Sequence, residues 1–329
     1  MVISKTPFRI SFFGGGTDYP AWYREHGGQV LSTTIDKYCY ISVRNFPPFF
    51  PYKHRIVYSK IEEVGEVNEI LHPAVKAVLQ FFKAEKGLSI HHDGDLPART
   101  GLGSSSAFTV GLLHALHAFY QQDIAKEDLA KEAVHIEQNI LKENVGSQDQ
   151  IAVTYGGFNN ILFSQNGEFR VEPVQVSNEQ IKELEGSLRL YFTGFSRIAS
   201  DVAKTQIDNI RQREKELMRM HDMTDKGIQI LKENKGVEEF GRLLHESWQI
   251  KKSLSDKITN PEIDAIYEKA RNAGAIGGKL LGAGGGGFLL LIIPPEKQQT
   301  VREALSGFLE VTCAFEKGGS QIIYNNKKI

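Results

Sequence analysis

The stretch that most constrains the fold is Asp95-Leu-Pro-Ala-Arg-Thr-Gly-Leu-Gly-Ser-Ser-Ser-Ala107, which runs directly into the apolar residues 108–119. Gly101 and Gly103 allow sharp turns and a close approach of the backbone to a ligand. The serines can cap the helix that follows, whose first N–H groups have no partner within the helix. Such a loop at the start of a buried helix predicts an anion site, most simply a phosphate site.

Two common phosphate-binding patterns do not fit this loop. A Walker A loop requires a lysine after its second glycine, and no lysine lies between Asp95 and Phe119. A dinucleotide fingerprint could use Ser106 and Glu127, but the loop lacks the third glycine. Taken alone, the loop is also compatible with a serine-capped core helix that binds no ligand.

Length and charge narrow the class of protein. A chain of 329 residues suits two domains, and 39 basic against 40 acidic residues give no electrostatic case for nucleic acid or membrane as a partner. The cysteines Cys39 and Cys313 stand far apart in strand-like sequence, which favours buried reduced thiols. No signal peptide and no bilayer-spanning apolar run is apparent, so we expect a cytoplasmic protein.

Periodicity predicts a mixed α+β fold. Strands are expected at residues 2–13, 30–45, 55–59 and 88–92, and helices at 73–86 and 126–143. Residues 178–185 read as a connection, which divides the chain into domains 1–180 and 181–329. In the second part we expect helices over 199–254, 261–273 and 296–308, and strands at 188–193, 275–281, 288–293, 310–315 and 321–324. This order suits a split βαβ layout.

Two further glycine clusters flank the central loop in sequence. The first, Gly14-Gly-Gly-Thr-Asp-Tyr19, follows the opening strand, and Arg9 projects from the face of that strand opposite Phe8 and Ile10. The second is Lys279-Leu-Leu-Gly-Ala-Gly-Gly-Gly-Gly287. Such clusters suit backbone that passes close to a bulky ligand, although the second cluster could equally be a flexible hairpin between two core strands, and Arg9 could form a structural ion pair.

Two acidic residues complete the candidate site. Asp149 lies in Gly146-Ser-Gln-Asp-Gln150 just after a predicted helix, and Glu137 flanks the apolar face of that helix. Each alone reads as surface charge. Glu137, however, is able to reach a partly buried position, because Ile136 and Ile140 lie beside it.

Taken together and in this order, the three glycine segments resemble the three signature motifs of the GHMP small-molecule kinases, and residues 146–150 resemble that family's catalytic aspartate segment. The resemblance spans nearly the whole chain. It implies a two-domain α+β fold with an N-terminal domain like ribosomal protein S5 and a C-terminal ferredoxin-like split βαβ domain. It also implies an ATP-dependent phosphotransferase that uses Mg²⁺.

The resemblance assigns roles residue by residue. Asp149 should accept or orient the proton of the sugar hydroxyl, with Arg9 beside it to stabilise developing negative charge. Ser105 and Glu137 should hold Mg²⁺. The ATP phosphates should be bound by Gly101, Leu102, Gly103, Ser104, Ser105 and Ser106, and the sugar by Asp18, Gly15, Gly16, Gly284 and Gly285. A distal phosphate needs a basic partner, for which Arg197, Arg99 and Arg44 are candidates.

Within the family the motifs look most like those of D-glycero-D-manno-heptose 7-phosphate kinases, which phosphorylate the anomeric hydroxyl. Galactokinases carry Gly-Glu-His-Thr-Asp-Tyr where this chain has Gly14-Gly-Gly-Thr-Asp-Tyr19, so their sugar-contacting glutamate corresponds to Gly15. Loss of that carboxylate disfavours galactose and favours a larger or phosphorylated sugar. A fucokinase-like kinase and a non-catalytic sugar- or nucleotide-binding homologue are the alternatives. The sequence leaves monomer and homodimer equally open.

Overall fold

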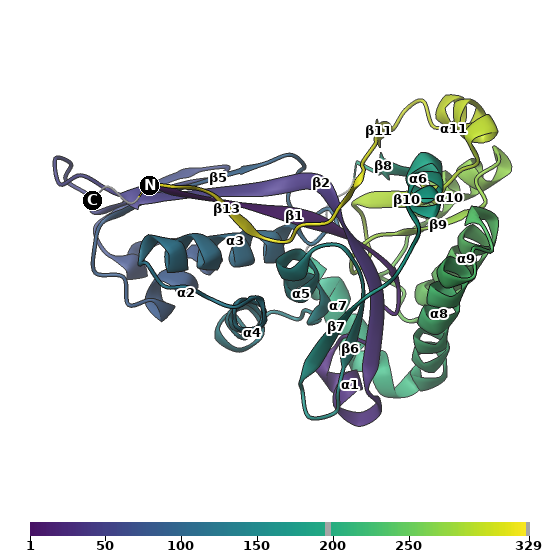
Figure 1. Cartoon of the computed structure of the whole chain (residues 1–329), viewed down its shortest axis with the longest axis horizontal. Helices are drawn as coiled ribbons and strands as arrows, with labels where there is room; N and C mark the ends of the chain where they lie inside the picture. Colours follow the sequence, from purple (N-terminus) through teal and green to yellow (C-terminus); the bar gives the residue numbers. More distant parts are fainter. Residues whose placement is uncertain (195–198, 327–329) are drawn as a thin grey trace.

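The computed structural model describes residues 1–194 and 199–326 and contains two β-sheets with helices packed against them (Figure 1). The nine-stranded first sheet consists of β1 (Val2–Phe13), β2 (Gly28–Asn45), β3 (His54–Val57), β4 (Ile61–Val64), β5 (Leu88–Gly94), β6 (Phe158–Phe163), β7 (Phe169–Pro173), β12 (Phe315–Glu316) and β13 (Gln321–Asn325). The four-stranded second sheet has the order β11 (Leu309–Val311), β8 (Leu188–Phe192), β10 (Phe288–Ile292), β9 (Gly277–Leu280).

The antiparallel pair β1 and β2 forms the centre of the first sheet. β2 is 18 residues long and pairs with β1, β5, β6 and β12 along its length. The register between β1 and β2 shifts after Pro7, whose ring nitrogen cannot donate a ladder hydrogen bond. Alternation along β1 sends Phe8, Ile10 and Phe12 into the hydrophobic core, and Arg9 to the opposite face.

Four helices cover one face of the first sheet below β1 and β2 in Figure 1: α2 (Pro73–Phe81), α3 (Ser104–Phe119), α4 (Lys126–His135) and α5 (Gln148–Tyr155). Apolar residues occur all round α3, and it is accordingly buried on most sides between the sheet and its neighbouring helices. A short helix, α1 (Pro20–His26), follows the first glycine cluster, and a 3₁₀ turn, η1 (Val67–Glu69), precedes α2.

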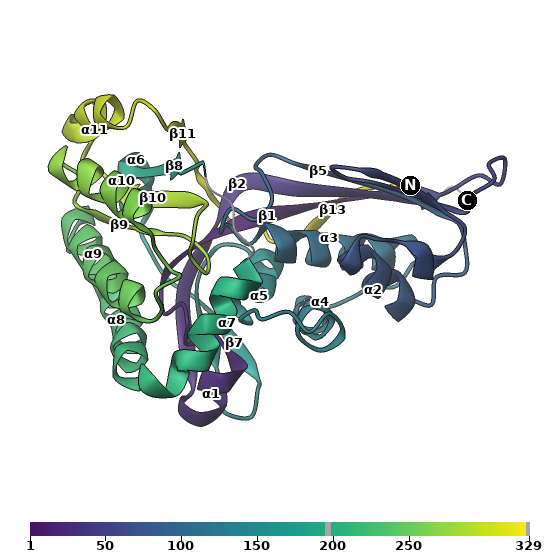
Figure 2. The ribbon, with the colours of Figure 1, turned by 180° about the vertical axis from the view of Figure 1, so that it is seen from behind.

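The chain's second half adds further helices, which Figure 2 shows from behind. They are α6 (Asn178–Ser187), α7 (Ala199–Asn209), α8 (Glu214–Lys232), α9 (Val237–Ser253), α10 (Pro261–Asn272) and α11 (Gln298–Ala304), with 3₁₀ turns η3 (Ile210–Gln212) and η4 (Pro295–Lys297). Of these, α9 packs against β9 and β10 of the second sheet, while α8 packs against α9 and against β1 and β2. The α+β class is confirmed. Over the described residues, no helix combines the length and the apolar character needed to cross a membrane.

Three local expectations were wrong. Residues 178–185 are not an irregular connection but most of α6, whose start is marked by a capping box in which Ser177 and Gln180 bond each other's backbone N–H groups. The helix expected over 73–86 ends at Phe81, before Gly87. In place of one helix over 126–143, the α-helix α4 ends at His135. The π-helical segment η2 (Ile136–Ile140), which contains Glu137, follows it directly.

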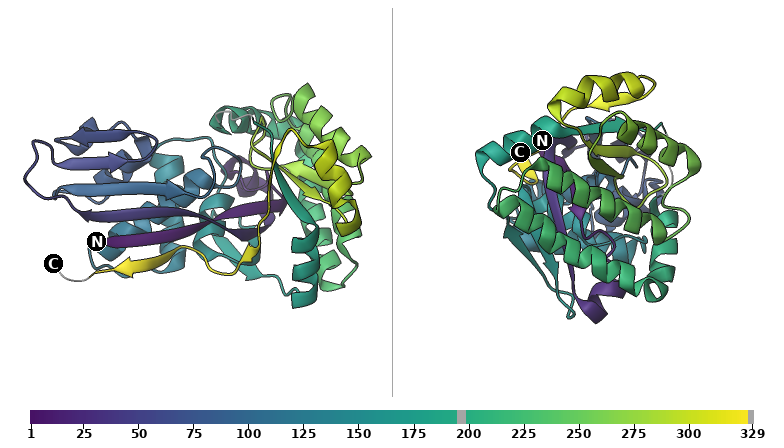
Figure 3. Two further views of the ribbon diagram at one scale, coloured as in Figure 1. Left: turned by 90° about the horizontal axis from the view of Figure 1, so that it is seen from above. Right: turned by 90° about the vertical axis from the view of Figure 1, so that its right-hand side faces the viewer.

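The last strands also differ from expectation, because they leave the second sheet. β12 pairs with β2, and β13 pairs with β1 along the edge of the first sheet, so Val2 and Asn325 lie side by side (Figure 3). The edge of β1 offers a row of N–H and C=O groups, and β13 satisfies them. The division of the chain at residue 180 stays a prediction. In the structure, β12 and β13 from the second part of the chain join the first sheet.

Candidate active site

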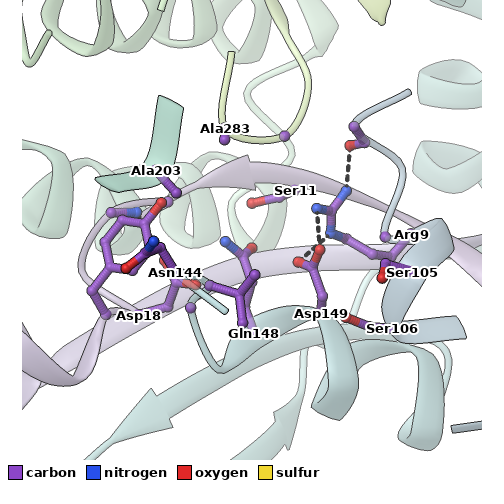
Figure 4. Close-up of a pocket in the computed structure, with 18 of the residues that line it drawn as sticks. Arg9, Ser11, Asp18, Ser105, Ser106, Asn144, Gln148, Asp149, Ala203 and Ala283 are labelled. Atoms are coloured by element: carbon purple, nitrogen blue, oxygen red, sulfur yellow. Dashed lines mark hydrogen bonds and ion pairs between the residues drawn. The ribbon is translucent and has the colours of Figure 1, made fainter. Parts of the chain in front are cut away.

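A pocket lies where the two halves of the chain meet, and Figure 4 shows it in close-up. One wall comes from β1, the first glycine cluster, the loop before α3 and the start of α5. The opposite wall comes from α7, α9, β9 and the last glycine cluster. The sequence-predicted residues in its lining are Arg9, Gly15, Gly16, Asp18, Arg99, Gly101, Gly103, Ser104, Ser105, Ser106, Glu137 and Asp149.

Arg9 and Asp149 meet in this pocket as the motifs predict. Arg9 Nε donates to Asp149 Oδ1 at 2.8 Å and Nη2 donates to Oδ2 at 2.7 Å, while Nη1 donates to the carbonyl of Gly101 at 2.6 Å. Arg9 is buried on β1, whereas Asp149, in the first turn of α5, keeps an exposed side. The guanidinium therefore fixes the carboxylate on the protein side and leaves it open to a ligand.

The loop before α3 has the conformation that an anion site needs. Gly101 and Gly103 have positive φ angles of 81° and 73°, so the chain turns sharply into the 16-residue helix α3. The N–H of Arg9 donates to the carbonyl of the buried Leu102 at 3.0 Å, which ties the loop to β1. The free N–H groups and positive dipole end of α3 thus face the pocket beside Ser104.

Glu137 is fully buried in the π-helical segment, a conformation that often occurs at functional sites. Its Oε2 accepts hydrogen bonds from Ser106 Oγ at 2.9 Å and from Gln150 Nε2, whereas its buried Oε1 has no partner among the described residues. Burial raises the pKa of Glu137 to about 7. The unpartnered Oε1 makes this carboxylate a candidate ligand for a cation.

These oxygen donors fit Mg²⁺, which binds one or two carboxylates and completes its shell with waters and substrate phosphates. The serine that contacts Glu137 is Ser106, while the expected ligand Ser105 is exposed at the pocket surface. Within the described residues, no cluster of three or more acidic, histidine or cysteine side chains offers a metal site without a ligand's help.

Asp18 occupies the other end of the pocket from Ser105 and Ser106 (Figure 4). Its Oδ1 accepts a hydrogen bond from the N–H of Gly16 at 2.8 Å, and burial raises the pKa of its carboxyl group. A side chain at Gly15 would meet no clash at its first atom: an added Cβ would make ordinary contacts, 3.8 Å from both Ser11 Oγ and Gln148 Nε2. This end of the pocket is lined by hydrogen-bonding groups, among them Asp18 and Gln148.

The last glycine cluster reaches the pocket through different residues from those expected. Gly282 and Ala283 line the pocket, whereas Gly284 packs against Ile258 and Gly285 donates to the Ile258 carbonyl at 2.8 Å. A Cβ on Gly282 would lie 2.5 Å from Gly101 Cα, so the two glycine loops touch backbone to backbone. The glycines at these positions permit a contact between the loops that any side chain would prevent.

The three arginines predicted as candidates to bind a distal phosphate differ in where they lie relative to the pocket. Arg99 lines the pocket beside the α3 loop, and Arg44 lies on β2 opposite Ser89, away from the pocket lining. Arg197 lies outside the described residues. Sequence reasoning missed two basic residues in the lining, Lys251 and Lys279.

A sequence signal for each of these lysines existed. Lys251 continues the buried face of α9, following Phe240, Leu244 and Trp248 at helical spacing. Lys279 opens the last glycine motif and stands in a strand whose residues are all buried. A lysine at an apolar position of a regular element indicates a buried charge, which is rare unless the charge has a function.

Comparison with known proteins supports the same family as the motifs. The model of the GHMP kinases N-terminal domain matches residues 69–157, and that of the GHMP kinases C-terminal domain matches residues 228–311, which together make up more than half of the chain. A D-glycero-alpha-D-manno-heptose 7-phosphate kinase from Campylobacter jejuni is 32% identical over 293 residues, covering 85% of this chain and 86% of that protein.

Other relatives agree in fold. The crystal structure of a D-glycero-D-manno-heptose 1-phosphate kinase from Bacteroides thetaiotaomicron superposes with a TM-score of 0.74 at 25% identity, covering 99% of this chain and all of that one. A galactokinase from Pyrococcus furiosus is 24% identical over 92% of this chain and 91% of its own length. With the Arg9–Asp149 pair and the α3 loop in one pocket, these matches show that the chain belongs to the GHMP kinases and is an ATP-dependent kinase.

Proposed function

We propose that this kinase transfers the γ-phosphoryl group of ATP to the anomeric hydroxyl of D-glycero-D-manno-heptose 7-phosphate and so forms the 1,7-bisphosphate. The observation that carries the proposal is the similarity to the Campylobacter jejuni enzyme over 85% of the chain, combined with Gly15 at the sugar end of the pocket. A glutamate at Gly15 would repel a phosphorylated substrate, and glycine removes that obstacle.

The nucleotide is expected at the start of α3. The N–H groups of residues 101–106 and the helix dipole hold the ATP phosphates beside Ser104 and Ser105. Glu137 and Ser106 are the residues that would hold Mg²⁺. The bound metal supplies charge neutralisation for the phosphate oxygens.

The acceptor hydroxyl is expected at Asp149. The carboxylate takes the hydroxyl proton as the sugar oxygen bonds to the γ-phosphorus, and the bond from that phosphorus to the β–γ bridging oxygen breaks to release ADP. Arg9 fixes the carboxylate through two hydrogen bonds and stabilises negative charge on the transferred group. Asp18, at the sugar end, accepts hydrogen bonds from other hydroxyls of the sugar.

A kinase of unphosphorylated sugars such as L-fucose is the second candidate. A bifunctional fucokinase/GDP-fucose pyrophosphorylase from Arabidopsis thaliana is 27% identical over 85% of this chain, although the match covers only 28% of that longer protein. The chain would then use the same Arg9–Asp149 pair, and an unphosphorylated sugar would bind beside Gly15.

The deciding experiment measures ADP release with Mg²⁺ and ATP against heptose 7-phosphate, L-fucose, galactose and mevalonate in parallel. We expect kcat/KM to be highest for heptose 7-phosphate by on the order of a hundredfold or more, the discrimination available from paired polar groups. A higher kcat/KM for fucose would overturn the heptose assignment and support the second candidate. Phosphorus NMR of the product distinguishes a C1 phosphate from a phosphate at another hydroxyl.

A further inference from the structure

Two buried lysines line the pocket and have no part in the mechanism above. Lys251 lies on α9 and Lys279 on β9, and their exposed fractions are only 4% and 2%. Lysine is almost never buried to this degree unless an acidic partner or a ligand compensates its charge. The carboxylates that act on Lys251 are Asp18 and Asp149. Both are engaged elsewhere, Asp18 by the N–H of Gly16 and Asp149 by Arg9.

The hydrogen bonds of the two lysines fix their ammonium groups without neutralising them. Lys279 Nζ donates to the carbonyl of Phe12 at 2.8 Å, and Lys251 Nζ donates to the carbonyls of Leu280, at 3.4 Å, and Gly282. An ammonium group has three N–H donors, so each lysine keeps donor capacity beyond these bonds. Both lysines therefore hold set positions and keep N–H donors that can still bind a ligand.

The neighbouring pocket wall also has unused polar atoms. Ser11 follows Arg9 on the pocket face of β1, and its buried Oγ has no partner among the described residues. The same is true of Gln148 Oε1. Ser11 and Gln148 lie beside Gly15, as the 3.8 Å distances from its added Cβ show. Lys279 donates to the carbonyl of Phe12, the residue after Ser11, so its ammonium group lies beside this part of β1.

Like charges lie close together in the pocket. Arg9, Lys251 and Lys279 act on one another, and Asp18 is a carboxylate that acts on both lysines in the opposite sense. Burial is the first cause that lowers the pKa of both lysines, and the neighbouring cations lower it further. A dianionic ligand would remove this repulsion and compensate both buried charges, as a phosphate monoester does.

We propose that Lys251 and Lys279 bind the non-reacting phosphate of the sugar phosphate and so make the kinase specific for a phosphorylated sugar. This inference rests on the proposed function. The ATP phosphates have their own site at the start of α3, beside Ser105 and Ser106, and the Arg9–Asp149 pair separates that site from the sugar end (Figure 4).

The test is isothermal titration calorimetry of heptose 7-phosphate, of unphosphorylated heptose and of ATP. It compares the wild type with Lys251→Met, Lys279→Met and the control Lys252→Met. Methionine matches the lysine stem without the charge. Lys252 adjoins Lys251, but its ammonium binds Asp264, so the control removes a lysine of the same helix outside the pocket lining.

We expect Lys251→Met and Lys279→Met each to weaken heptose 7-phosphate binding by about 10- to 100-fold, the effect of losing one charged hydrogen bond. Binding of unphosphorylated heptose and of ATP should stay within about threefold of the wild type, the spread expected for groups that do not touch the lost charge. Lys252→Met should bind all three ligands as the wild type does. Melting temperatures should not fall, because each substitution removes an unpaired buried charge.

The outcomes separate the two proposals. Variants that keep the wild-type preference for the phosphorylated sugar would overturn the lysine assignment alone. Weakened ATP binding with an unchanged sugar preference would indicate that the lysines bind the nucleotide phosphates, and this result would also overturn the lysine assignment. A wild type that does not bind heptose 7-phosphate would overturn both proposals. If Lys279→Met does not fold, the titrations of Lys251→Met decide the question.

Discussion

Arg9 and Asp149 are joined by two parallel hydrogen bonds of 2.8 and 2.7 Å, across 140 positions of sequence. The third arm of the guanidinium donates to the carbonyl of Gly101. One buried side chain thereby sets the position of the candidate base relative to the loop that should hold the ATP phosphates. Because a guanidinium is planar and rigid, it fixes the direction of the carboxylate as well as its position.

Replacing the candidate base should remove turnover while keeping the fold. Asp149→Asn retains an oxygen that accepts from Arg9 but cannot take up a proton, so we expect kcat to fall by about 10²- to 10⁴-fold. ADP release under saturating ATP and sugar phosphate measures it. Asp128→Asn, on the exposed face of α4, is the matched control and should leave kcat unchanged. A folded Asp149→Asn enzyme with near-wild-type turnover would show that Asp149 is not the base.

The Mg²⁺ concentration that gives half-maximal rate should test whether Glu137 and Ser106 hold the metal. Ser106→Ala removes the hydroxyl that donates to Glu137, and the Mg²⁺ concentration for half-maximal rate should rise by roughly 10- to 100-fold, the usual effect of losing a group that supports a metal ligand. Glu137→Gln should raise it further because the carboxylate charge is lost.

The control for the metal experiment is Glu127→Gln, an exposed acid in the first turn of α4. The assay titrates Mg²⁺ at fixed ATP and compares the half-maximal concentrations. Unchanged values for both Ser106→Ala and Glu137→Gln would remove this pair of residues from the metal site.

Much of the site was predictable because its residues lie in short, local motifs. Arg9 follows from strand alternation, and the α3 loop follows from glycine and serine chemistry at a helix start. The choice of serine was not predictable in this way. Whether Ser105 or Ser106 faces Glu137 depends on how α3 is rotated about its axis and on the π-helical turn that holds Glu137. The sequence pattern specifies neither of these.

Long-range placement was the other limit of the sequence. β13 has the alternation of any short strand, and only the open edge of β1 decides which sheet it joins. Lys251 and Lys279 come from elements some thirty residues apart and become a pair only when α9 packs beside β9. Apolar periodicity marks each lysine as a buried position, but only the packing of α9 against β9 brings the two into one pocket.

The space at Gly15 gives a test of substrate charge. Gly15→Glu should be accommodated, because its added Cβ makes only ordinary contacts at 3.8 Å, but it would bring a negative charge beside Ser11 and Gln148. We expect the KM for heptose 7-phosphate to rise by tenfold or more, because like charges in a shared site cost on the order of several kcal/mol.

Gly15→Gln is nearly the same size without the charge and serves as the control for this experiment. It should raise the KM for heptose 7-phosphate much less than Gly15→Glu does. The KM for unphosphorylated heptose should respond similarly to both variants. Equal KM values for the phosphorylated sugar in the two variants would indicate that size, and not charge, limits the pocket at Gly15.

The buried charge of Lys251 should also appear in the pH dependence of stability. The groups that face it are Arg9 from β1, Asp18 after β1, Asp149 from α5 and Lys279 from β9. Burial and then Arg9 lower its pKa from 10.5 to about 8. Below pH 8 both folded and unfolded states hold the proton, and the folded state bears the cost of burying the charge.

Between pH 8 and 10.5 the folded state has lost that proton while the unfolded state retains it, so the free energy of unfolding should rise with pH. The slope from this group is at most about 1.4 kcal/mol per pH unit. Lys251→Met should therefore be more stable than the wild type near pH 7, and its advantage should shrink above pH 8. Lys251→Arg, which stays charged throughout, should lack the rise. Urea unfolding of the ligand-free proteins at pH 7, 8.5 and 9.5 measures these differences, and parallel curves for all three would show that Lys251 is not a strained buried charge.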